Sequence, residues 1–108
     1  MELVKAVYEL IADFPKEEKY GLRSQIARAA VSIPSNIAEG SSRKSEMDFA
    51  RFLEMALGSA FELETQIILA KDLELININK AKKILNGIDS VQKQLHNLII
   101  SIKQSKNK

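Results

Sequence analysis

Arg28-Ala-Ala-Val-Ser-Ile-Pro-Ser-Asn-Ile-Ala-Glu-Gly40 is the stretch of this sequence that decides the fold. Wound as a helix, it continues the apolar face of Leu22 and Ile26 with Ala29, Ala30, Ile33 and Ile37. The opposite side carries small, weakly polar residues where charges are usual: Ser24, Ala27, Val31, Ser35 and Ala38. This pattern favours burial of both sides, one in its own domain and one against another helix or subunit. Pro34 removes an amide donor in the middle, so we predict a kink there.

Length and composition restrict the class of protein. The 108 residues fit one domain, and 45% hydrophobic with 28% charged residues is ordinary for a globular protein. The absence of Cys excludes a disulfide framework, a thiol nucleophile and a thiolate metal site. No apolar run approaches the ~18 residues of a membrane span and no signal-peptide pattern is present, so we expect a cytoplasmic protein without membrane association. A net charge of +2 permits nucleic-acid binding but does not require it.

Apolar residues at three- and four-residue steps predict four helices. The first is expected over about 2–13 and ends before Pro15, because the residue before a proline is pushed out of the helical region. The quoted stretch belongs to a second helix over about 21–40, with Gly40 as its stop. A third helix is expected over about 45–71 and a fourth over about 79–103, capped by Ser45 and by Asn77 or Asn79 respectively.

The fourth helix has the clearest periodicity in the chain. Its apolar residues step alternately by three and four: Ala81, Ile84, Ile88, Val91, Leu95, Leu98 and Ile102. Strict heptad spacing favours near-parallel packing in a left-handed bundle. Four helices with short links therefore predict a single all-α domain over residues 1–108, an antiparallel up-down-up-down four-helix bundle. We expect its core to contain Ile26, Ile33, Ile37, Leu53, Leu63, Ile67, Ile84, Ile88, Val91, Leu95 and Leu98.

The sequence lacks the patterns that catalysis and metal binding need. The four glycines are scattered, so there is no phosphate-binding loop. The single histidine, His96, has no partner in its helical turn that would orient it as a base, and a surface position is the favoured interpretation. Glu54, Glu62 and Glu64 suggest a carboxylate metal site, but the required Glu-x-x-His pairs are missing. We therefore predict a non-enzymatic protein with no cofactor, no metal and no small-molecule substrate.

Two motifs resemble those of a known family. The first runs from Phe14 to Ile26 and on through the quoted stretch. The second is Phe52-Leu-Glu-Met-Ala-Leu-Gly-Ser-Ala60, continued by Glu62-Leu-Glu-Thr-Gln66 and Leu69-Ala70. Together they look like the signature of the bacterial four-helix-bundle proteins named for intervening sequences in 23S ribosomal RNA genes. Members of that family usually begin with an extra turn or two carrying Trp, which this chain lacks. We therefore expect a shorter first helix or a misplaced start codon.

The resemblance also implies an assembly and a set of partners. Proteins of this family form homopentamers, five bundles arranged as a barrel around an axis. A relative in architecture is the accessory variability determinant of diversity-generating retroelements, a pentamer that binds a reverse transcriptase and nucleic acid. By resemblance, the candidate partners are the chain itself, RNA or DNA, and a reverse transcriptase.

A candidate oligomer interface lies on the second helix and on the glycine side of the third: Ser24, Ala27, Arg28, Val31, Ser35, Ala38, Glu39 and Gly58. Gly58 weakens a helix by up to ~1 kcal/mol relative to Ala, and the close approach of another backbone would compensate. Arg28 and Glu39 lie roughly 16 Å apart along the helix axis. We expect each of them to interact with a group outside its own helix, either in a neighbouring subunit or in solvent.

A candidate nucleic-acid surface is formed by basic residues near the second and third helices and at the C-terminus: Arg23, Arg43, Lys44, Arg51, Lys103 and Lys106. Phe49 and Phe52 lie among them, but we expect these rings in the core and not as stacking platforms. A solvated surface is the favoured interpretation of the basic residues taken alone. We therefore favour a self-assembling binding or scaffold module, with a direct RNA- or DNA-binding protein as the alternative.

Overall fold

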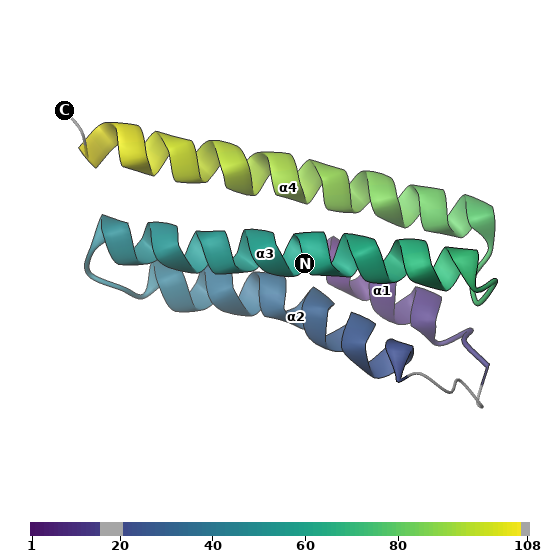
Figure 1. Cartoon of the computed structure of the whole chain (residues 1–108). Helices are drawn as coiled ribbons and strands as arrows, with labels where there is room; N and C mark the ends of the chain where they lie inside the picture. Colours follow the sequence, from purple (N-terminus) through teal and green to yellow (C-terminus); the bar gives the residue numbers. More distant parts are fainter. Residues whose placement is uncertain (16–20, 107–108) are drawn as a thin grey trace.

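The computed structural model describes residues 1–15 and 21–106. These residues form four helices and no strand: α1 (Glu2–Ile11), α2 (Leu22–Ser41), α3 (Glu46–Asp72) and α4 (Ile78–Lys106). Figure 1 shows α2, α3 and α4 side by side along the length of the molecule, with the shorter α1 beside one half of them. The predicted all-α four-helix bundle is confirmed.

α2 and α3 run in opposite directions, and so do α3 and α4. These directions follow from four contacts, which join Ser32 to Ser59, Gly40 to Phe52, Glu64 to Gln92, and Glu54 to Lys103. In each helix pair, later residues of one helix meet earlier residues of the next. α3 packs against both α2 and α4, and α1 lies between α2 and α4 on the other side of the core.

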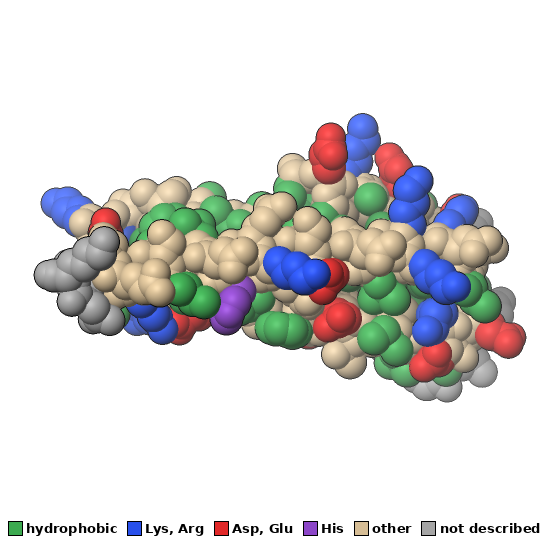
Figure 2. All heavy atoms as spheres, turned by 90° about the horizontal axis from the view of Figure 1, so that it is seen from above, with side chains coloured by type: hydrophobic (Ala, Val, Ile, Leu, Met, Phe, Trp, Pro, Cys, Tyr) green, Lys and Arg blue, Asp and Glu red, His purple; other side chains and the backbone are tan. Residues whose placement is uncertain are grey.

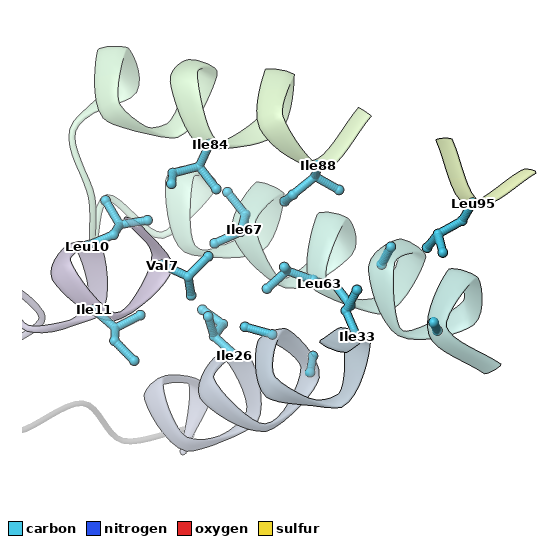
Figure 3. Close-up of a cluster of buried hydrophobic side chains, with 14 of the residues drawn as sticks. Val7, Leu10, Ile11, Ile26, Ile33, Leu63, Ile67, Ile84, Ile88 and Leu95 are labelled. Carbon is cyan, nitrogen blue, oxygen red and sulfur yellow. The ribbon is translucent and has the colours of Figure 1, made fainter. Parts of the chain in front are cut away.

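The core is a continuous cluster of buried apolar side chains from all four helices (Figure 3). Most of the predicted core residues are buried: Ile26, Ile33, Leu53, Leu63, Ile67, Ile84, Ile88 and Leu95. Ile37 and Val91 are half-buried and pack against this cluster. Leu98 is 41% exposed, so the prediction that placed it in the core is wrong.

The error at Leu98 follows from the geometry of α4. A straight α-helix has 3.6 residues per turn and drifts by about 20° per heptad from a strict seven-residue repeat. In its second half α4 therefore turns Gln92 and Ile99 inward, in place of Val91 and Leu98. Burial of Gln92 is tolerated because its amide donates to Ala60 O at 3.5 Å and to a Glu64 carboxylate oxygen at 3.3 Å.

Two helix starts have the side-chain caps that the sequence predicts. The Ser45 hydroxyl accepts a hydrogen bond from the Asp48 amide at 3.1 Å, at the start of α3. At the start of α4 the cap is Asn77, whose side-chain oxygen accepts from the amides of Asn79 and Lys80 at 2.7 and 3.3 Å. Of the two asparagines considered as the cap, Asn77 is therefore the one that caps α4.

Gly40 has a different role from the one expected. α2 continues past it to Ser41, so it does not end the helix. Gly40 is buried, and a Cβ atom there would lie 2.7 Å from Phe52 Cβ and 2.9 Å from Phe49 Cδ1. The missing side chain lets the end of α2 approach α3.

Pro34 lies inside α2, which continues without a break on both sides of it. The Asn36 amide donates to Ser32 O at 2.8 Å and to the Ser32 hydroxyl at 3.0 Å, one turn back. This side-chain contact supports the backbone beside the proline, where the regular pattern of amide donors is interrupted. A kink at Pro34 stays a prediction.

Candidate functional site

The small-residue side of α2 faces outward from the bundle. Val31 is 40% exposed, Ser24, Ser35 and Ala38 are exposed as well, and Ala27 is half-buried. This row of small and apolar residues is therefore exposed to water in the single chain. Such a row lets a second backbone approach closely.

Gly58 lies at the same level of the bundle as Val31. The hydroxyls of Ser32 and Ser59 are 2.8 Å apart across the α2–α3 contact. Val31 and Gly58 each precede one of these serines, whereas the residue after each serine is buried. Because consecutive residues of a helix point about 100° apart, Val31 and Gly58 both turn to the outer side of the α2–α3 pair.

The space around Gly58 is open. A Cβ atom built at Gly58 would meet no heavy atom within 4 Å. Met55, one turn earlier on α3, is 50% exposed. We call the surface formed by Ser24, Ala27, Arg28, Val31, Ser35, Ala38, Met55 and Gly58 the α2–α3 outer surface. Met55 has no signal in the sequence, because which flank of α3 faces outward depends on how α2 and α4 pack against it.

Arg28 and Glu39 both have partners in their own chain. Arg28 Nη2 donates to the Ser24 hydroxyl at 3.1 Å, one turn back in α2. Glu39 Oε1 lies 2.6 Å from Arg43 Nη2, just beyond the end of the helix. Arg28 thus has a partner within its own helix, contrary to the expectation. Both side chains are exposed, as the solvent alternative expects, and pairing with a neighbouring subunit stays a prediction.

The basic residues proposed for nucleic acid are mostly engaged within the chain. The intramolecular partners are Phe14 O for Arg23, Glu39 for Arg43, Asp48 for Arg51 and Glu54 for Lys103. Lys44 is exposed and has no ion-pair partner among the described residues, and the side chain of Lys106 lies outside them. Between residues 39 and 51 the three basic side chains are balanced by three acidic ones, so this corner carries no net charge.

Phe52 is neither a core residue nor an open stacking platform. Its side chain is half-buried at the α2–α3 corner. The guanidinium carbons of Arg43 and Arg51 lie 4.9 and 5.6 Å from the centre of its ring, within the range of cation–π contacts. Two arginines therefore occupy ring surface that a nucleic-acid base would need for stacking.

An open groove of about 610 Å³ lies between α1 and α4. Its floor includes Leu3, Leu10 and Ile84, and its rims carry Glu9 on α1 and Lys83 on α4. No set of three His, Asp or Glu side chains in the described part of the chain is placed to hold a metal ion. None of the helices, as far as they are described, is long and apolar enough to span a membrane.

Comparisons with known proteins agree with this architecture. One similar solved structure is a crystal structure of a protein of unknown function from the S23 ribosomal protein family of Bacteroides thetaiotaomicron. It is 27% identical, covers 91% of this chain and 92% of its own, and superimposes with a TM-score of 0.81. None of the curated proteins matches the chain. The family model for the 23S rRNA-intervening sequence protein matches residues 1–97. This match spans most of the chain, which therefore belongs to the 23S rRNA-intervening sequence protein family.

Proposed function

We propose that this protein is a non-enzymatic binding or scaffold module that works as a homo-oligomer. The observation that carries the proposal is the α2–α3 outer surface, where Val31 and Met55 are 40% and 50% exposed beside the open side of Gly58. Exposed apolar side chains among small residues have the composition of a helix-packing contact, and burying them in a subunit interface removes apolar area from water. Five subunits are proposed from the family resemblance.

Assembly gives a small, weakly charged chain a larger and more strongly charged surface. Each subunit has a net charge of +2, so a ring of five carries five times that charge, or +10. The partners proposed for this ring are those that the resemblance suggests: RNA or DNA, or a reverse transcriptase. A cytoplasmic location is part of the same proposal.

Direct nucleic-acid binding by the single chain has less support. Four of the six candidate residues have intramolecular partners, and the α2–α3 corner is neutral. An RNA gel shift across a salt series tests this alternative, because phosphate contacts release counterions and binding then falls steeply with salt. Tight binding by a monomeric form, lost on replacing Lys44 and Arg51 by Ala, would favour the alternative over the scaffold role.

The proposal is tested by light scattering on purified protein at micromolar concentration. The wild type is expected to have a mass several times the 12.1 kDa of one chain. Val31→Arg should shift it to the monomer, because the new guanidinium would be buried without a partner in the contact. Asn86→Arg is the matched control, since it adds the same side chain at an exposed position of α4 outside this surface. A monomeric wild type, or a Val31→Arg variant that assembles like the control, would overturn the proposal.

A further inference from the structure

The groove between α1 and α4 is lined by two helices that run in opposite directions. Lys80 Nζ lies 3.3 Å from Asp13 Oδ2, just beyond the end of α1. Farther along, a Cβ atom built on Gly87 would lie 3.3 Å from Leu3 Cδ1, near the start of α1. Seven residues from the Asp13–Lys80 pair, in the middle of the groove, Ala6 of α1 and Gly87 of α4 lie at the same level.

The floor of the groove is apolar and has its smallest residues in the middle. Larger apolar residues surround Ala6 and Gly87 on both helices: Leu3, Leu10, Ile84 and Val91. A glycine and an alanine at this level let a bound partner come close to the backbones of α1 and α4. The floor therefore offers a partner both apolar area and close approach.

The two rims of the groove carry charges of opposite sign. Glu2 and Glu9 stand on the α1 rim and Lys83 on the α4 rim, and all three side chains are exposed. The ion pairs of the described residues include Asp13 with Lys80 but none of these three. Figure 2 shows red and blue side chains gathered around α1, with green ones among them. The rims thus leave an acidic edge and a basic edge available to a partner.

The spacing of the rim charges fits a helix. Glu2 and Glu9 are seven residues apart, which is about 10 Å along α1. Residues seven apart on a helix laid along the groove recur at the same interval. A small molecule fits less well, because sites for small ligands are concave and enclose most of the ligand, whereas this groove is open. A nucleic acid is disfavoured because its phosphates would lie against the acidic rim.

We propose that the groove between α1 and α4 binds an amphipathic helix of another protein. The apolar stripe of that helix lies on the floor, its basic edge faces Glu2 and Glu9, and its acidic edge faces Lys83. The inference rests on the binding role proposed above and names the class of partner. It does not require self-association, because the groove shares no residue with the α2–α3 outer surface.

Designed peptides of about 14 residues, which are about 21 Å long as helices, serve as the probe. Each has Leu at the a and d positions of two heptads and Gln at b, c and f. The Lys/Glu peptide carries Lys at g and Glu at e, so that its two edges have opposite charges. Control peptides carry Lys at both positions or Glu at both. In fluorescence anisotropy at low salt, the Lys/Glu peptide should bind several-fold more tightly than either control, because it alone complements both rims.

Substitution on the floor locates the binding. Ala6→Arg should weaken binding of the Lys/Glu peptide at least tenfold, because it puts a long charged side chain between the peptide and the apolar floor. Ala12→Arg is the matched control, since it adds the same side chain at an exposed position just after α1 that does not line the groove. It should bind like the wild type. Circular dichroism checks that both variants stay helical.

Reversal of the α1 rim tests the charge pairing without touching the floor. Glu2→Lys and Glu9→Lys together make both rims basic, and both positions are exposed, so we expect the bundle to keep its fold. The preference should then switch from the Lys/Glu peptide to the peptide with Glu on both edges. An unchanged preference, an Ala6→Arg variant that binds like Ala12→Arg, or no binding of the Lys/Glu peptide at about 100 μM would overturn the proposal.

Light scattering on the same samples reports self-association separately. An oligomeric wild type that does not bind the Lys/Glu peptide would overturn the helix partner and leave the proposed assembly intact. A monomeric wild type that binds this peptide, with the preference switched by the rim variant, would overturn the assembly and support the helix partner.

Discussion

Gly40 and Gly58 lie in neighbouring helices, yet replacing each by Ala is expected to change stability in opposite directions. At position 40 the new methyl carbon would lie 2.7 Å from Phe52 Cβ. That atom is bonded directly to the backbone of α3, so no rotamer change moves it away and the two helices must separate locally. At position 58 the new methyl carbon meets no heavy atom within 4 Å.

The magnitudes follow from helix propensity and packing. Ala in place of Gly stabilises a helix by up to ~1 kcal/mol, and overpacking a well-packed contact costs about 1–3 kcal/mol. In a single bundle, Gly58→Ala should therefore raise the free energy of unfolding by roughly 0.5–1 kcal/mol. Gly40→Ala should lower it by about 1–2 kcal/mol, because the overpacking exceeds the gain in propensity.

Urea unfolding followed by circular dichroism measures both effects. The Val31→Arg background is expected to keep the bundle monomeric, so that subunit contacts do not enter the comparison. In the wild-type background Gly58→Ala is expected to weaken assembly instead, because its methyl group would come between approaching backbones. A stabilising Gly40→Ala, or a Gly58→Ala that destabilises the monomer, would refute this account of the two glycines.

The remaining predictions concern the core, a helix cap and an ion pair, each measured by urea unfolding of the monomeric background. Leu95→Ala should lower the free energy of unfolding by about 2–5 kcal/mol, because Leu95 is buried. Leu98→Ala should lower it by less than about 1 kcal/mol, because Leu98 is partly in water already; equal losses at the two positions would show that the whole heptad stripe is buried. Ser45→Ala should cost about 1 kcal/mol, because the Asp48 amide loses its acceptor, and an unchanged stability would argue against the cap. Lys103→Ala should cost less than about 1 kcal/mol, because its ion pair with Glu54 is half exposed; a larger loss would show that this pair is shielded from water.

The elements of the fold could be predicted from local patterns. Apolar periodicity, Pro15 and the cap at Ser45 predict helix positions, because they act on the backbone within a turn or two. The heptad of α4 also identifies Ile84, Ile88 and Leu95 as buried. The exposure of Leu98 could not be predicted in this way, because it depends on whether another helix reaches that level. The pattern of α4 alone carries no information about the length of α1.

The candidate site was harder to predict, because it depends on how helices pair in space. The small-residue row of α2 is visible in the sequence, and the structure places it on the outside of the bundle; its burial in a subunit contact stays a prediction. The engagement of Arg43 with the Phe52 ring requires the turn between α2 and α3, and a helical period gives no signal for it. The close approach at Gly40 is likewise a property of the α2–α3 pair, and in the sequence this glycine resembles an ordinary helix stop.

The mass of the wild-type protein in solution tests the central claim most directly. Light scattering coupled to size exclusion, or native mass spectrometry, at micromolar concentration and moderate salt gives that mass without any substitution. The account predicts an assembly of several chains, and the family resemblance sets the number at five, each of 12.1 kDa. A single species of 12.1 kDa across the micromolar range would contradict it, because the α2–α3 outer surface would then remain in water.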